Sequence, residues 1–243
     1  MPADLLLLVV GAAVAGLVQG LSGFAFSMVA MSFWAWGLDP KLASVMAVFG
    51  SLSGQVVAAV STGRRFRVDA IGPYLAGGLI GIPVGVFVLP CLNPDAFKLG
   101  LGLVLVIWCP LMLVSSRLPA ITAGGRIADG LAGAAGGFMG GIGGLTGVIP
   151  TLWSTLRGLE KEHQRAIIQS FNLVTLSVTM LVYLATGLVS KEMLPLLPVV
   201  FLALLFPVLL GIRLYSRLSQ VMFRKMVLVV LMLSGVAMLM ALR

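Results

Sequence analysis

The chain has 243 residues, of which 60% are hydrophobic and 10% are charged, and its mean hydropathy is +1.12. Such a composition excludes a soluble globular domain and indicates a polytopic membrane protein of the all-α class. The net charge of +8 would suit a nucleic-acid partner. Because the basic residues lie in short loops between apolar segments, the charge instead indicates membrane topology, and we expect no nucleic-acid binding.

Apolar segments follow one another along the whole chain, and we expect helical structure in each. They cover residues 4–37, 42–62, 70–91, 96–115, 127–156, 164–187, 192–212 and 221–242. A helix that crosses a bilayer needs about 20 residues, so most of these segments fit one ordinary span. The segments 4–37 and 127–156 are too long for one span and too short for two.

Each of these two long segments carries a glycine cluster near its middle. The first reads Gly16-Leu-Val-Gln19-Gly20-Leu-Ser22-Gly23, and on superposition its glycines fall on Gly133, Gly137 and Gly140 of the second. Glycine weakens a helix, and lipid tolerates a break only where protein or a water-filled cavity satisfies the freed backbone groups. We expect each long segment to be broken or re-entrant at its Gly-rich motif. One long tilted helix, or plain helix packing through small residues, is the alternative.

The distribution of Lys and Arg favours re-entry. Cytoplasmic loops collect basic residues, which places the loop Arg64-Arg65-Phe66-Arg67 in the cytoplasm. If both long segments return to the side on which they begin, most of the 16 cations become cytoplasmic, namely Arg64, Arg65, Arg67, Arg117, Arg126, Arg157, Lys161, Arg165, Arg213, Arg217, Arg224 and Lys225. A single crossing by 127–156 would remove this bias. We therefore expect a multi-pass protein of the plasma (inner) membrane with cytoplasmic basic loops.

Re-entry makes the two halves of the chain inverted repeats. Gly37-Leu38-Asp39 parallels Gly158-Leu159-Glu160 after a short insertion in the second copy, and Ser51 parallels Asn172. Residues 1–118 and 119–243 would then be two transmembrane repeats of four helical segments each. Together they form one transport domain about a pseudo-two-fold axis in the membrane plane.

The twin Gly-rich segments, the basic loop after the second span and the Gly-Ile-Pro-Val-Gly stretch at 81–85 resemble the sulfite exporter TauE/SafE family of membrane permeases. The resemblance covers about residues 5–240 and is strongest from Gly140-Gly141-Ile142-Gly143-Gly144 to Pro150. In the first copy, Phe24-Ala25-Phe26-Ser27 stands where the family usually has further glycines. The resemblance implies a permease for small anions such as sulfite, sulfonates or related organosulfur or carboxylate anions.

Small oxyanions bind well at a helix end inside a membrane, because unpaired N–H groups and the positive end of the helix dipole face them. Glycines let the anion reach the backbone, and short polar side chains complete its shell. The expected substrate-binding residues are Gln19, Gly20, Ser22, Gly23, Ser51, Gln55, Gly140, Gly141, Gly143, Gly144, Thr146, Gln169, Asn172 and Thr175. For the hydroxyl side chains the alternative is a hydrogen bond within their own helix.

The acidic residues all lie at segment ends, and no Lys, Arg or His occupies an expected mid-membrane position. A proton relay usually needs a buried acid, so we expect a permease driven by the substrate gradient and the membrane potential, or one that moves a protonatable substrate. An inside-negative potential favours anion export by about 2.3 kcal/mol per charge per 100 mV. No cofactor or metal is expected, since Cys91, Cys109 and His163 lack ligand spacing. The expected partners are a small anionic substrate and the lipid bilayer, with a homodimer left open.

Two other functions fit single features. Gly20-Leu21-Ser22-Gly23 has the form of an intramembrane serine protease motif, but Ser22 would need a base within reach, and His163 is expected near the cytoplasmic surface. A non-transporting membrane assembly subunit would not need paired interior breaks. We therefore expect no enzymatic activity. The tryptophans are expected to be interfacial anchors, namely Trp34, Trp36, Trp108 and Trp153. For Trp36 and Trp153, which follow the glycine clusters, lining an entrance is the alternative.

Overall fold

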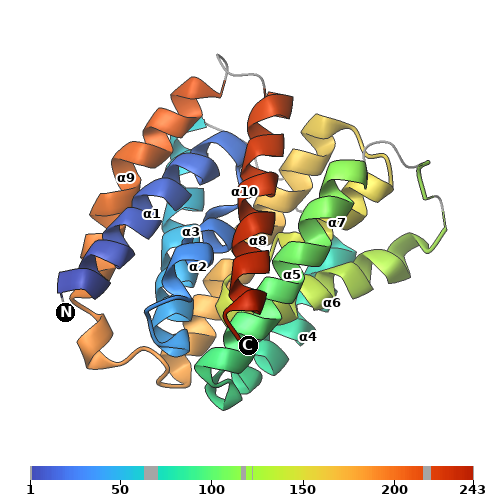
Figure 1. Cartoon of the computed structure of the whole chain (residues 1–243). Helices are drawn as coiled ribbons and strands as arrows, with labels where there is room; N and C mark the ends of the chain where they lie inside the picture. Colours follow the sequence, from blue (N-terminus) through green and yellow to red (C-terminus); the bar gives the residue numbers. More distant parts are fainter. Residues whose placement is uncertain (1, 63–70, 116–118, 122, 216–219, 243) are drawn as a thin grey trace.

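The computed structural model describes residues 2–62, 71–115, 119–121, 123–215 and 220–242. Within these ranges the chain is all-helical, without strands (Figure 1). The α-helices are α1 Pro2–Ser22, α2 Phe26–Trp34, α3 Pro40–Thr62, α4 Gly72–Val88, α5 Pro94–Val114, α6 Gly125–Gly143, α7 Val148–Leu156, α8 Lys161–Ala185, α9 Leu196–Leu214 and α10 Gln220–Met240. The short 3-10 helices η1 Leu89–Cys91 and η3 Lys191–Met193 lie at helix junctions.

Six helical stretches in the described ranges are long and apolar enough to cross a membrane: Asp4–Ser22, Pro40–Ser61, Gly72–Cys91, Pro94–Val114, His163–Ala185 and Lys191–Leu214. The first of them is α1, one arm of the long segment 4–37, and the others match expected ordinary spans. The expected span at 221–242 forms α10, whose apolar described part, Lys225–Met240, is shorter. The chain is therefore a polytopic all-α membrane protein.

The first long segment folds as a helical hairpin. It breaks after α1 at Gly23, whose φ is +89°, and α2 then runs back beside α1. The indole nitrogen of Trp34, at the end of α2, donates to the carbonyl oxygens of Leu7 and Leu8 at 3.2 and 3.3 Å. Since Leu7 and Leu8 lie near the start of α1, the chain returns almost to the level where the hairpin began.

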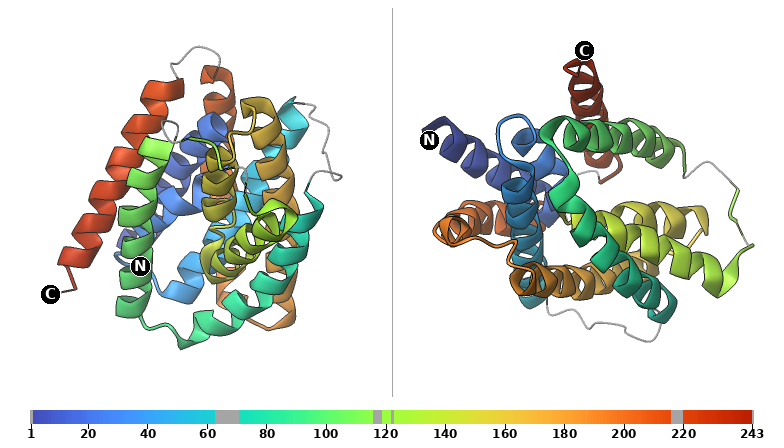
Figure 2. Two further views of the ribbon diagram at one scale, coloured as in Figure 1. Left: turned by 90° about the vertical axis from the view of Figure 1, so that its right-hand side faces the viewer. Right: turned by 90° about the horizontal axis from the view of Figure 1, so that it is seen from below.

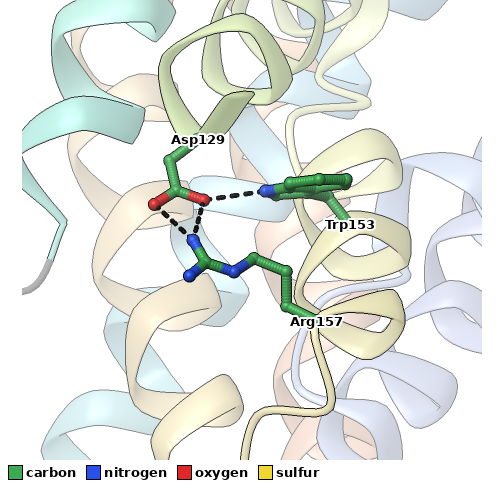
Figure 3. Close-up of polar contacts among 3 residues, drawn as sticks. All are labelled: Asp129, Trp153 and Arg157. Atoms are coloured by element: carbon green, nitrogen blue, oxygen red, sulfur yellow. Dashed lines mark hydrogen bonds and ion pairs between the residues drawn. The ribbon is translucent and has the colours of Figure 1, made fainter. Parts of the chain in front are cut away.

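The second long segment is a hairpin as well. It breaks after α6 at Gly144, with φ +71°, and α7 returns. The indole nitrogen of Trp153 on α7 donates to Oδ1 of Asp129 near the start of α6, at 2.7 Å. Arg157, directly after α7, forms an ion pair with the same carboxylate at 2.8 Å (Figure 3). These contacts hold the open end of the hairpin together.

The two break residues correct the superposition of the glycine clusters. Gly23 and Gly144 both take a left-handed φ. Their amides donate at 2.7 Å to the carbonyl oxygens of Gln19 and Gly140, respectively. Gly23 therefore corresponds to Gly144 and not to Gly140. With that register Gly37 aligns with Gly158 directly, without the short insertion expected in the second copy.

Each hairpin packs against a helix of the other half of the chain: α1 lies along α9, and α6 lies along α4 (Figure 1). A Cβ atom on Gly211 of α9 would lie 2.9 Å from Cα of Gly20, and one on Gly85 of α4 would lie 3.0 Å from Cα of Gly141. No side chain fits at that distance, so these glycines allow the close helix packing common in membranes. A third pair is formed by α5 and α10, which lie side by side (Figure 2).

Two of the tryptophans are not interfacial. Trp34 and Trp108 have 0% and 4% of their surface exposed. Their indole nitrogens donate inside the protein, Trp34 across the first hairpin and Trp108 to the carbonyl oxygen of Val148 at 2.7 Å. The expectation of an interfacial anchor is therefore wrong for both residues, because each indole spans two helices of the apolar core.

Candidate functional site

The chain segments that adjoin the two breaks pack against each other in the interior. A Cβ atom on Gly147 would lie 3.3 Å from Cδ2 of Phe24, and one on Gly144 would lie 2.6 Å from Oγ of Ser27. Phe24 and Ser27 follow the first break, and Gly144 and Gly147 belong to the second. The chain therefore brings its two Gly-rich motifs together from opposite halves of the sequence.

The two hairpins overlap along the direction of α3, so their breaks lie at different heights along this helix. Beside the first break, Nε2 of Gln55 on α3 donates to the carbonyl oxygen of Gly23 at 2.8 Å. Beside the second, a Cβ atom on Gly144 would lie 3.2 Å from Cα of Val48, about two turns earlier on α3. Between these levels the return segments 24–27 and 145–147 run past each other. Ser51 of α3 and Asn172 of α8 lie at this middle level.

Uncharged polar groups meet at the middle level. The hydroxyl oxygens of Ser27 and Ser51 are 2.6 Å apart, and Oγ1 of Thr146 donates to Oδ1 of Asn172 at 2.9 Å. Nε2 of Gln19 donates to the carbonyl oxygen of Ser51 at 3.0 Å. All five side chains are at most 3% exposed. Within the described part of the chain Oε1 of Gln19 has no hydrogen-bond partner, which is unusual for a buried acceptor.

A second polar group surrounds the first break. A Cβ atom on Gly23 would lie 3.0 Å from Nε2 of Gln169 and 3.7 Å from Nε of Arg165. The guanidinium carbon of Arg165 lies 4.2 Å from the ring centroid of Tyr215, which follows α9. Arg165 was expected in a cytoplasmic turn, and neither it nor Ser27 nor Tyr215 was among the expected site residues. The four-residue spacing of Arg165 and Gln169 puts both on one face of a helix, and this spacing could have indicated that Arg165 lies near the site.

Several expected site residues have local or packing contacts. Oγ of Ser22 accepts hydrogen bonds from the amides of Phe24 and Ala25 at 3.4 and 3.3 Å, so it caps the turn at the break. Oγ1 of Thr175 donates to the carbonyl oxygen of Phe171 within α8, at 2.7 Å. Gly20 and Gly141 face α9 and α4.

The remaining two glycines of the second cluster lie near the break. A Cβ atom on Gly140 would meet Cγ2 of Thr146, and one on Gly143 would lie 2.7 Å from Cε of Met31. The structure thus gathers Gln19, Gly23, Ser51, Gln55, Gly140, Gly143, Gly144, Thr146, Gln169 and Asn172 around the two breaks. It places Gly20, Gly141, Ser22 and Thr175 in packing, capping or intrahelical contacts.

The side chains of this site can interact with a ligand mainly through hydrogen bonds. They are amides and hydroxyls, with one guanidinium at the first break. Among the described residues, no three His, Cys, Asp or Glu side chains gather where they could hold a metal ion. Amide and guanidinium donors beside bare backbone suit a small oxyanion.

A sequence model of the family described as sulfite exporter TauE/SafE matches residues 7–238. The chain belongs to the sulfite exporter TauE/SafE family. The resemblance drawn from the Gly-rich segments is therefore confirmed over nearly the whole chain. TauE/SafE proteins are membrane transporters of sulfur-containing anions, which makes this chain a multi-pass membrane transporter. No curated protein and no solved structure matches it.

Proposed function

We propose that this TauE/SafE protein is a permease that binds sulfite, a sulfonate or a related organosulfur or carboxylate anion at mid-membrane, between its two Gly-rich breaks. One observation carries the proposal: buried amide and hydroxyl groups from α3, α8 and both return segments converge where the breaks meet. In the interior of a membrane protein, buried polar side chains more often line a substrate pathway than serve only to stabilise the fold.

We also infer that residues 1–118 and 119–243 are inverted repeats forming one transport domain. Matching contacts support this. Gly211 lies against Leu17 and Gly20, and Gly85 lies in the same way against Phe138 and Gly141. In the register set by the two breaks, Leu17 corresponds to Phe138 and Gly20 to Gly141. Each hairpin therefore meets the other half through equivalent positions.

We propose that the protein lies in the plasma membrane with its basic loops on the cytoplasmic side. Two contacts support the placement of Arg157 and Arg165 on the same side of the membrane. Arg157 after α7 pairs with Asp129 near the start of α6, and Arg165 near the start of α8 stacks on Tyr215 after α9. The cations Arg64, Arg65, Arg67, Arg117, Arg217 and Arg243 lie outside the described residues.

Export is the proposed direction, because the inside-negative potential drives an anion outward by about 2.3 kcal/mol per charge per 100 mV. The proposal includes no catalysis. Oγ of Ser22 accepts hydrogen bonds from two backbone amides, a capping role that supports transport over proteolysis.

The test is flux of radiolabelled sulfite into proteoliposomes that hold the purified full-length chain. We expect uptake above that of protein-free liposomes, accelerated by an imposed inside-positive potential and independent of a sodium or proton gradient. Thr146→Val removes the hydroxyl that donates to Asn172 and should lower the flux about tenfold. Thr186→Val is the matched control. The exposed Thr186 hydroxyl donates to backbone carbonyl oxygens of the preceding turn of α8, those of Val182 at 2.8 Å and Tyr183 at 3.4 Å, and the flux of this variant should be unchanged.

Two outcomes would count against the proposal. Flux of sulfite, sulfonates and carboxylates no faster than through protein-free liposomes would reject the permease. Flux that requires an imposed sodium or proton gradient would reject the uncoupled mechanism and keep the permease.

A further inference from the structure

Ser44 of α3 carries a buried hydroxyl group without a hydrogen-bond partner. Its side chain is 0% exposed, and within the described part of the chain its Oγ makes no hydrogen bond. Serine hydroxyls in helices often donate to a carbonyl oxygen of the preceding turn, as that of Ser154 does to Thr151 at 3.0 Å. Most buried polar side-chain atoms are paired, because an unpaired one loses its hydration without compensation. Ser44 therefore keeps a donor available for a ligand.

The Ser44 hydroxyl lies beside the second break. Its Oγ is 3.7 Å from the position that a Cβ atom of Gly143 would take, and Gly143 directly precedes the break at Gly144. The terminal methyl group of Met31 on α2 covers the same point, since its Cε lies 2.7 Å from that position. The hydroxyl and the methyl group thus flank one point beside the bare backbone of the break.

The equivalent position in the other half of the chain also approaches a break. In the register that aligns Gly23 with Gly144, Ser44 of α3 corresponds to Arg165 of α8. Nε of Arg165 lies 3.7 Å from the Cβ position of Gly23, and Oγ of Ser44 is equally far from that of the glycine before Gly144. From the same position, each of these helices therefore sends a polar group to the break of the opposite half.

Met31 is suited to act as a movable cover over this hydroxyl. Its side chain is 0% exposed, but it is unbranched, with three rotatable bonds and a soft thioether that adapts to new surroundings. The atom that covers the point is the far end of this side chain. A change of rotamer can therefore uncover the Ser44 hydroxyl while the backbone of α2 stays in place.

We propose that Ser44 is a further substrate-binding residue, whose hydroxyl donates to an oxygen of the sulfite, sulfonate or carboxylate group when Met31 withdraws. This inference rests on the proposed permease function and adds to it a binding residue and a movable cover at the second break. A hydrogen bond to a charged oxygen is stronger than one to a neutral acceptor. Because the anion has to displace Met31 before it gains this bond, Met31 lowers its apparent affinity.

The experiment compares Ser44→Ala with Ser154→Ala in denaturant unfolding in detergent and in the sulfite KM of proteoliposome flux. Ser154 is equally buried, at 0% exposed, but its hydroxyl is already paired with the carbonyl oxygen of Thr151. Ser44→Ala should raise KM roughly tenfold and leave the midpoint of unfolding unchanged or higher, because the folded chain loses no hydrogen bond. Ser154→Ala should lower the midpoint and leave KM unchanged.

An unchanged KM in folded Ser44→Ala would overturn the inference. If Ser44→Ala does not fold, Met31→Ala decides, with sulfite affinity measured by calorimetry in lipid nanodiscs. Removal of the cover should make sulfite bind several-fold more tightly. Met238→Ala, at an equally buried methionine of α10, should bind sulfite as the wild type does. If Met31→Ala bound sulfite no more tightly than Met238→Ala, the inference would be rejected.

The wild type tests the proposed function separately. Sulfite flux in the wild type with an unchanged KM in Ser44→Ala would leave the permease standing and reject only the role of Ser44. Calorimetric sulfite binding that weakens in Ser44→Ala, together with a wild type that shows no flux, would keep the binding residue and reject the permease. A wild type that neither binds nor transports an oxyanion would reject both.

Discussion

Gly144 and Gly187 have the same backbone conformation but different surroundings. Both have φ +71°, yet a Cβ atom on Gly144 would lie 2.6 Å from Oγ of Ser27, whereas one on Gly187 would meet nothing within 4 Å. A left-handed conformation costs a side-chain-bearing residue about 1–2 kcal/mol. Substitutions at Gly144 and Gly187 would cause the same backbone strain, but only a substitution at Gly144 would also crowd the second break. Comparing the two therefore distinguishes strain from crowding.

We predict that Gly187→Ala lowers the free energy of unfolding by about 1–2 kcal/mol and leaves sulfite flux intact. Gly144→Ala should cost about 1–3 kcal/mol more because of overpacking, and it should abolish flux by displacing Ser27 from Ser51. Denaturant unfolding in detergent and proteoliposome flux measure the two effects. Equal stability losses and equal fluxes in the two variants would contradict the crowded contact between the breaks.

At the residue scale, most of the polar side chains around the two breaks could be predicted as site residues from their polarity alone. Gln19, Ser51 and Asn172 stand out because amides and hydroxyls are uncommon in apolar spans. Arg165 could not be identified in the same way. It lies close to a charged turn in the sequence, and the sequence does not show that its side chain stacks on Tyr215 after α9 and approaches Gly23 of the other half.

At the scale of elements, the open end of the second hairpin depends on one carboxylate. Asp129 accepts hydrogen bonds from Trp153 at 2.7 Å and from Arg157 at 2.8 and 2.9 Å. The side chains of Arg157 and Asp129 are 27% and 13% exposed, so water screens their attraction only in part. Figure 3 shows both partners coming from the returning arm of the hairpin.

We predict an Asp129–Arg157 coupling energy of about 1–3 kcal/mol in a double-mutant cycle made from Asp129→Asn and Arg157→Gln, measured by denaturant unfolding. The same cycle with Asp95→Asn in place of Asp129→Asn should give a coupling near zero, since Asp95 is exposed at the start of α5. If the two cycles gave the same coupling, the ion pair would not hold the hairpin together.

The existence of the breaks was predictable from the glycine clusters, whereas their register was not. In the second cluster the spacing of Gly16, Gly20 and Gly23 occurs four times. The glycine sets are 133/137/140, 136/140/143, 137/141/144 and 140/144/147. Glycines that serve close packing and glycines that end a helix share this spacing. Only the backbone angle, which the sequence does not contain, identifies Gly144 as the break.

At the scale of the whole molecule, the proposed permease mechanism requires the two hairpins to enter the membrane from opposite sides. Composition was sufficient to predict an all-helical membrane protein, because 60% of its residues are hydrophobic. The pairing of α1 with α9 and of α6 with α4 joins residues far apart in the chain. It follows from the shapes of the packing surfaces, which a hydropathy pattern does not describe.

The most direct measurement is the accessibility of single cysteines at residues 39 and 160, both exposed just beyond the returning arms. Asp39→Cys and Glu160→Cys are introduced separately into a transport-competent background in which Cys91 and Cys109 are replaced. A membrane-impermeant maleimide should label residue 39 in intact cells and residue 160 only after permeabilisation. Labelling of both residues from the same side would contradict the opposed hairpins and the central binding site built on them.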